Sequence, residues 1–179
     1  MNDAEIRKRL NEIDCTDRRT HVEQIEAFRK AEPSLSVELV QDCTGWDDSY
    51  ICHLYTFGVP QDSDIFFQKE KVFPIYPTLR HCAIFEDLEG HGLIQKVAIM
   101  QDANLVLYYQ LKQGKECHIH SGKVDGQYVI SKWGRGHVWR HYPQHVASVY
   151  EDSGVLRMHF YKHTDPSQTM QYFAKKARS

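Results

Sequence analysis

The order of apolar and polar positions divides the chain into a helical first part and a strand-rich second part. Residues 3–11 and 19–31 have helical spacing: in the second segment Val22, Ile25 and Phe28 recur at every third position. Residues 35–41 alternate apolar and polar side chains, which is typical of a half-buried strand. The start of the chain therefore predicts two helices followed by a strand.

A polar turn over residues 42–49 precedes an apolar and aromatic segment that predicts a short helix ending near Phe57. The turn residues able to cap this helix are Asp47, Asp48 and Ser49. Residues 61–75 show no regular pattern, and a further helix is expected from Pro77 to Gly90.

Beyond Gly92, short segments rich in β-branched and aromatic residues alternate with turn residues, as the strands of a sheet do. These segments are 93–100, 104–111, 116–124, 127–134 and 155–163. Helices followed by a mainly antiparallel sheet are typical of an α+β fold. With 179 residues and no repeat or linker, the chain is expected to form one domain.

The Asp-Gly dipeptide at 125–126, between two strand-like segments, predicts a two-residue hairpin turn. In that hairpin Val124 would pair with Gln127. His120 would then lie opposite Ser131 on the same face of the sheet, with their side chains in contact.

His118 precedes His120 by two residues, so an unbroken strand would place both histidines on one face. Gly122 would leave open space beside His120 on that face. A histidine with a hydroxyl opposite it and space beside it can act as a base whose orientation the hydroxyl fixes. The simpler interpretation is that both are ordinary half-exposed histidines, two of the 11 in the chain.

Composition and charge narrow the classes of partner. A formal charge of −2 and the lack of a long basic run argue against nucleic-acid binding. No segment approaches the roughly 18 apolar residues of a membrane span, and the charged N-terminus lacks the apolar core of a signal peptide. The five cysteines show no Cys-x-x-Cys spacing, which predicts free thiols in a reducing compartment. A cytoplasmic location is expected, although export without a signal peptide fits the same sequence.

The order of a cysteine at the start of a helix, then a strand carrying His-x-Gly before a hairpin, resembles the papain-like cysteine hydrolases of the NlpC type. The matching segments are "YICHLYTFG" with Cys52, "NLVLYY" before the histidine strand, and "HSGKVDGQYVISKWG" with His120. The resemblance covers residues 45–163, which would form the papain-like core. Residues 1–44 would be an N-terminal extension of helices and a strand, and residues 164–179 a tail.

The resemblance implies a cysteine that attacks an amide, a histidine that deprotonates it and a third polar residue that orients the histidine. On this chain it implies Cys52 as nucleophile, His120 as base and Ser131 in the third position. Family members more often carry histidine, asparagine or glutamine in that position, and His137 or His141 could fill it instead. The resemblance implies a peptide or protein substrate and no cofactor.

Cys43 is a second candidate nucleophile, because residues 42–45 are similar to the family's Asp-Cys-Ser-Gly signature. The apolar segment around Cys52 favours Cys52, since the positive end of a helix there would lower the pKa of its thiol. Lys132 is expected to point away from this site. Residues 133–143 would form a loop over it.

Two other classes of function remain open. A metal site could use Cys117, His118 and His120, but strand alternation sends Cys117 to the other face and no paired Cys/His spacing is present, so no metal is predicted. A non-catalytic interaction protein could use exposed aromatic side chains. These would be Trp133, Trp139, Tyr142 and Tyr150. Within the enzyme class, the target could be a cell-wall peptide, or a protein reached by a delivered effector.

Overall fold

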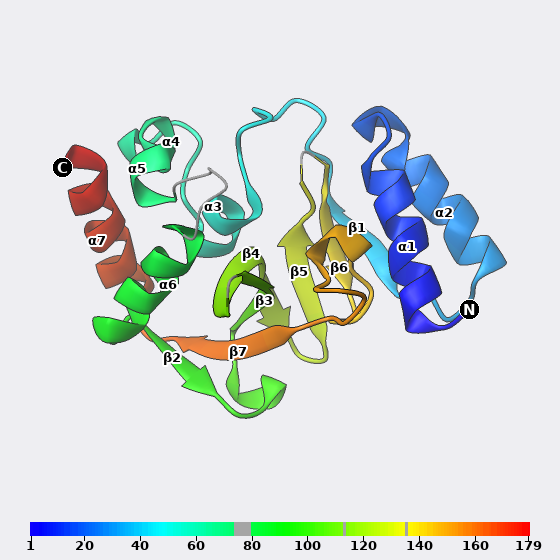
Figure 1. The fold of residues 1–179 in the computed structure, drawn as a ribbon. Helices are drawn as coiled ribbons and strands as arrows, with labels where there is room; N and C mark the ends of the chain where they lie inside the picture. The colour runs from blue at the N-terminus through cyan, green and yellow to red at the C-terminus, as the bar shows by residue number, and fades with distance from the viewer. Residues whose placement is uncertain (74–79, 113, 135) are drawn as a thin grey trace.

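A seven-stranded antiparallel sheet in the order β1-β6-β5-β4-β3-β7-β2 forms the centre of the molecule (Figure 1). The computed structural model describes residues 1–73, 80–112, 114–134 and 136–179. The strands are β1 Val37–Gln41, β2 Ile94–Val97, β3 Leu105–Lys112, β4 Lys115–Asp125, β5 Tyr128–Lys132, β6 Val138–His141 and β7 Met158–His163. The predicted α+β class is confirmed, whereas the papain-like architecture stays a prediction.

Helices flank this sheet on both sides. They are α1 Asp3–Asp14, α2 His21–Ala31, α3 Cys52–Phe57, α4 Asp64–Phe67, α5 Lys69–Val72, α6 Arg80–Gly90 and α7 Pro166–Arg178, with 3-10 turns η1 Arg18–Thr20, η2 Met100–Asp102 and η3 Ser148–Tyr150. The two predicted N-terminal helices and the helix ending at Gly90 are confirmed, while Pro77 lies outside the described residues. None of the helices in the described ranges is long and apolar enough to cross a bilayer.

Two apolar cores lie on opposite faces of the sheet. Leu105 and Leu107 of β3 face the first core, to which α3, α4, α5, α6 and α7 contribute. Val106 and Tyr108, the alternate residues of the same strand, face the second core with α1, α2 and η3. In Figure 1, α1 and α2 lie at one end of the molecule and α4 to α7 at the other. Each site residue can therefore be assigned to one core.

Residues 164–179, predicted to be a tail, contain the helix α7. Asp165 caps the helix by accepting a hydrogen bond from the Gln168 backbone N–H, and Pro166 occupies the first turn. Phe173 and Ala177, four positions apart, are buried in the first core. The charged residues at the end of the chain therefore lie on an amphipathic helix.

Residues 61–75, predicted to be irregular, contain the short helices α4 and α5. Residues 133–143, predicted to be a loop, contain strand β6, which pairs with β1 and β5 and so joins the predicted first strand to the sheet. Aromatic packing explains this position: Trp133 and Trp139 are only 2% and 1% exposed and lie in the second core. Tyr150 is buried with them and Tyr142 is half-buried, so the prediction of an exposed surface is wrong for Trp133, Trp139 and Tyr150.

The hairpin between β4 and β5 turns one residue later than predicted. Val124 pairs with Val129, not with Gln127, because Gly126 and Gln127 form the turn. Gly126 has a φ of +61°, which suits the first central residue of a type II′ turn. The predicted register is therefore wrong.

A β-bulge at Ile119 interrupts β4. Tyr108 of β3 pairs with His120, whereas the next residue, Tyr109, pairs with His118. One residue of β4 is therefore extra relative to β3, which reverses the usual alternation of side chains at this point.

The bulge sends His118 and His120 to opposite faces. The His118 ring lies 5.0 Å from that of Phe85 in the first core. The His120 ring lies 4.0 Å from that of Tyr150 in the second core. The prediction that both histidines share one face is wrong, because strand alternation alone does not reveal a bulge.

The space predicted beside Gly122 is filled by β5. A Cβ atom at this position would lie 2.4 Å from Val129 Cγ1 and 3.0 Å from Ser131 Cβ. Glycine is thus required for β4 to approach β5 closely.

The substitution Gly122→Ala should destabilise the protein by about 1–3 kcal/mol through overpacking. The measurement is urea unfolding followed by circular dichroism. Gly90→Ala is the matched control: no atom lies within 4 Å of the added methyl, and this helical position tolerates alanine. Equal stability of Gly122→Ala and the wild type would contradict this close contact.

Candidate functional site

Three buried polar side chains form a hydrogen-bonded row across β4, β5 and β6. His120 Nε2 lies 3.1 Å from Ser131 Oγ, which lies 2.8 Å from His141 Nε2. The row ends at the main chain, where His141 Nδ1 lies 2.7 Å from the Tyr142 carbonyl oxygen. His120, Ser131 and His141 are all fully buried. We call these three residues the relay.

The Tyr142 carbonyl at the end of the relay determines which atoms of the relay donate and which accept. A carbonyl oxygen only accepts, so His141 must carry its proton on Nδ1 and leave Nε2 as an acceptor. Ser131 then donates its hydroxyl proton to His141 Nε2 and accepts from Nε2–H of His120. His120 in its neutral form is therefore bare on Nδ1.

Burial keeps both histidines of the relay neutral. It lowers the pKa of His141 to about 4. Burial also lowers the pKa of His120 well below its ordinary value, and the nearby charges of His141, His53 and Lys132 act in the same direction. At neutral pH the tautomers therefore follow from the hydrogen bonds alone.

The His120 ring is held flat against Tyr150. The two rings are 4.0 Å apart with an angle of 13° between their planes. The Tyr150 hydroxyl accepts a hydrogen bond of 3.0 Å from the Gly134 backbone N–H. Within the described residues, Nδ1 of His120 is buried and has no hydrogen-bond partner. An oriented imidazole with an unused lone pair is suited to accept a proton.

Cys52 is the first residue of α3. The N-cap is Ile51, which makes no side-chain cap, so the predicted caps are wrong. Asp47 instead accepts hydrogen bonds from the backbone and hydroxyl of Ser49, which closes a turn before the helix. Apolar residues of α3, Leu54 and Phe57, anchor the helix in the first core.

Burial raises the pKa of the Cys52 thiol to about 11. The backbone N–H groups of Ser121 and His53 and the positive charge of Lys132 oppose this effect without overcoming it. The prediction of a lowered pKa is therefore wrong, because α3 has only six residues and burial disfavours the charged thiolate. At neutral pH Cys52 is a protonated thiol.

Cys52 and His120 lie close in the fold but are not joined. α3 packs against β4 and β5, and Ser121, whose N–H stabilises the Cys52 sulfur, directly follows His120. No hydrogen bond links the Cys52 thiol to His120 Nδ1 in the described structure. The structure therefore places the Cys52 sulfur beside the backbone of Ser121, without joining the thiol to the His120 ring.

Lys132 is buried beside the cysteines instead of pointing away as predicted. It is 1% exposed, and its Nζ donates a hydrogen bond of 2.7 Å to the Gly134 carbonyl. Burial lowers the pKa of Lys132, against the charges of Cys43, Cys52 and Asp14. Burial also raises the pKa of Asp14 to about 6. The positive charge of Lys132 would stabilise a thiolate at Cys43 or Cys52, and strand alternation gave no sign of this position.

Cys43 is buried and is held by its backbone. Its N–H donates a hydrogen bond of 3.0 Å to His137 Nδ1, and its thiol lies 3.6 Å from the Gln41 carbonyl. Burial raises the pKa of the Cys43 thiol. His137 Nε2 in turn donates to the Arg18 carbonyl at 2.8 Å. His137 therefore positions the main chain and does not join the relay, whereas His141 does.

The cysteines whose side chains are described are free thiols. They are Cys15, Cys43, Cys52 and Cys117.

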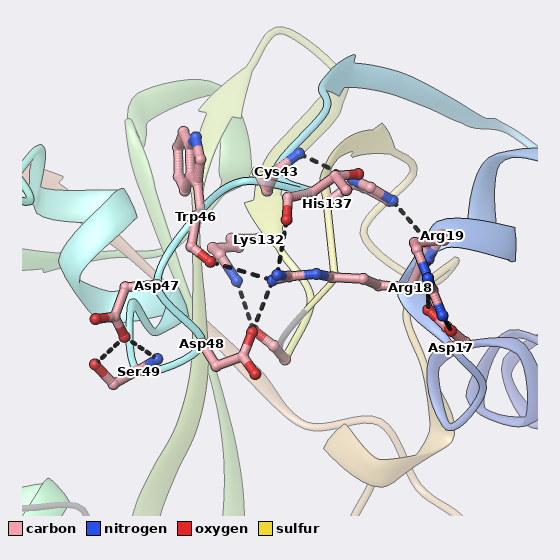
Figure 2. A network of polar contacts seen from close by, with 12 residues as sticks. Asp17, Arg18, Arg19, Cys43, Trp46, Asp47, Asp48, Ser49, Lys132 and His137 are labelled. Atoms are coloured by element: carbon pink, nitrogen blue, oxygen red, sulfur yellow. Dashed lines mark hydrogen bonds and ion pairs between the residues drawn. The ribbon is translucent and has the colours of Figure 1, made fainter.

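Arg18 ties the N-terminal helices to the turn that precedes α3 (Figure 2). Its guanidinium donates to the Thr44 carbonyl at 2.8 Å and to the Trp46 carbonyl at 3.4 Å. It also forms an ion pair of 2.8 Å with Asp48. Figure 2 shows Lys132 beside this network, on the side of the turn that faces Arg18. Arg18 lies outside the predicted papain-like core of residues 45–163, yet it holds the turn that leads to Cys52.

No protein-family model, curated protein or solved structure matches the chain.

Replacing Arg18 with alanine should increase the rate at which iodoacetamide alkylates Cys52 by several-fold, because the turn before α3 loses its tether and opens more often. Peptide mass spectrometry of the folded protein measures each cysteine separately. Exposed Cys15 should react first in every variant. Arg19→Ala is the matched control, since Arg19 pairs with Asp17 of its own turn. Equal Cys52 rates in the two variants would contradict this role of Arg18.

Proposed function

We propose that the protein is a cysteine hydrolase that cleaves an amide or peptide bond. Cys52 is the nucleophile, His120 the base, and Ser131 with His141 orients the base. The observation that supports this proposal best is the proton order of the relay, which leaves a bare Nδ1 on a histidine held in one orientation. The resemblance of residues 45–163 to NlpC-type enzymes supports the same assignment.

The chemistry uses the two groups in turn. His120 Nδ1 accepts the thiol proton as the Cys52 sulfur bonds to the carbonyl carbon of the substrate. The C–N bond then breaks, and the amine leaves with the proton from His120. Water, deprotonated by the same nitrogen, attacks the thioester, which releases the acid and restores the thiol. The Cys52 backbone N–H is expected to stabilise the oxyanion.

Ser131 acts as a link in this proposal. An asparagine or glutamine in the third position would accept directly from His120, whereas a serine can rotate and needs a further group to fix its proton. His141 supplies that group, because its own tautomer is fixed by the Tyr142 carbonyl. Ser131 and His141, both candidates for the third position, thus act together: His141 orients Ser131, and Ser131 orients His120.

Reaction requires the start of α3 to move toward His120. The thiol is buried, its pKa is near 11, and the hydrogen bond to the base is unmade. Substrate binding at the turn before α3 would supply this movement, since Arg18 holds that turn in the free protein. The free protein is then a low-activity form. Cell-wall peptides and proteins targeted by delivered effectors are the substrate classes that the resemblance favours.

The proposal predicts a burst of p-nitrophenol when a Cys15→Ser protein, which lacks the exposed thiol, is mixed with p-nitrophenyl acetate, with one acyl group on Cys52. Cys52→Ser should abolish the burst, and His120→Ala should slow acylation by about 10²–10⁴-fold. Ser131→Ala should slow it less, by about tenfold, because the ring stays stacked on Tyr150. Stopped-flow absorbance and intact-mass analysis measure both quantities.

Cys43→Ser is the control for this experiment, since both cysteines are buried and only Cys52 is assigned to the reaction. An intact burst in Cys52→Ser, or its loss in a folded Cys43→Ser protein, would contradict the assignment.

A further inference from the structure

A second group of polar side chains lies on the first-core face of the sheet, opposite the relay. Glu116 and His118 of β4 and His159 of β7 each offer one potential ligand atom, and these atoms all lie within 4.8 Å of one another. Tyr109 of β3 lies between the histidines, with its ring 6.1 Å from His118 and 4.3 Å from His159. The bulge at Ile119 creates this group by turning His118 away from His120.

His118 is buried without any polar partner. It is 5% exposed, and within the described chain neither Nδ1 nor Nε2 has a hydrogen-bond partner. Burying an imidazole that makes no hydrogen bond costs free energy. A ligand from outside the chain that binds His118 would remove this cost. Burial also lowers the pKa of His118 to about 4, which keeps the ring in the neutral form that binds metals.

Glu116 and His159 place potential ligand atoms next to each other. His159 Nδ1 lies 3.3 Å from a carboxylate oxygen of Glu116, and this nitrogen also lacks a hydrogen-bond partner among the described residues. Glu116 is exposed and His159 half-buried, so the group is open to solvent on one side. Two imidazoles and one carboxylate form the ligand set of three-ligand zinc sites and of some iron(II) sites.

We propose that Glu116, His118 and His159 bind one divalent transition-metal ion, with Zn²⁺ as the best fit and water in the fourth position. Bonds of about 2.0–2.2 Å would bring the ligand atoms to about 3.4 Å from one another. The exposed carboxylate side chain of Glu116 can make most of that adjustment. The site is separate from the relay and does not depend on the proposed hydrolase.

The hydrogen bond from Lys96 to His159 competes with metal binding. Its Nζ lies 3.1 Å from His159 Nε2 and donates to it. A metal on Nδ1 requires a proton on Nε2, which excludes this donation, so the exposed Lys96 side chain must swing away. Removing Lys96 should therefore strengthen metal binding.

The test is titration of metal-free full-length protein with Zn²⁺, and with Co²⁺ as a spectroscopic probe. The expected result is one ion per chain, with a Co²⁺ spectrum that shows nitrogen and oxygen ligands and no sulfur charge-transfer band. Glu116→Gln, a conservative substitution at an exposed position, should weaken binding at least about tenfold. His118→Ala and His159→Ala should abolish it, and Lys96→Ala should tighten it several-fold.

His91→Ala is the control for adventitious histidine binding, because His91 is exposed at the end of α6. Circular dichroism melting identifies any variant that fails to fold. Failure of the wild type to bind either ion would overturn the proposal. So would affinity unchanged in Glu116→Gln, or a sulfur charge-transfer band, which would assign the ion to Cys117 or another thiol.

Discussion

The hydrogen bond between His141 and the Tyr142 carbonyl sets the chemistry of the buried relay. A carbonyl oxygen cannot donate, so this one contact fixes the proton on His141, then the direction of the Ser131 hydroxyl, and finally the tautomer of His120. Burial reinforces the order by keeping both rings neutral. A serine, whose hydroxyl can rotate, can therefore hold a histidine in the tautomer that a general base needs.

The bulge in β4 gives the molecule two separate histidine sites. By reversing the alternation between His118 and His120, it sends one ring to each core. The relay is fully buried, whereas the group around His118 is partly open to solvent. A single extra residue thus determines which histidines can cooperate in acid–base chemistry and which can bind an ion.

The sequence predicted the helices α1 and α2, the α+β class and the contact between His120 and Ser131, but not the register behind that contact. The two side chains meet even though the hairpin turns at Gly126 and Gln127, because a histidine reaches diagonally across neighbouring strands. The bulge left no local signal.

Tertiary burial explains the other differences from the sequence predictions. Lys132 and the Cys52 thiol are enclosed by segments distant in the chain, and this enclosure raises the thiol pKa where local helix geometry predicted a decrease. The apolar stripe that makes α7 a helix was present at Phe173 and Ala177, but the charged residues around it favoured a tail.

Long-range ¹H–¹⁵N correlation spectroscopy of the histidine rings tests the proton order of the relay most directly. His120 should carry its proton on Nε2 and His141 on Nδ1, and both should stay neutral from pH 8 to about 5.5, because burial lowers both pKa values. His120→Gln and His141→Gln variants assign the signals. A His120 ring protonated on Nδ1, or one that becomes charged near pH 6.5, would contradict the relay and remove the main support for His120 as the base.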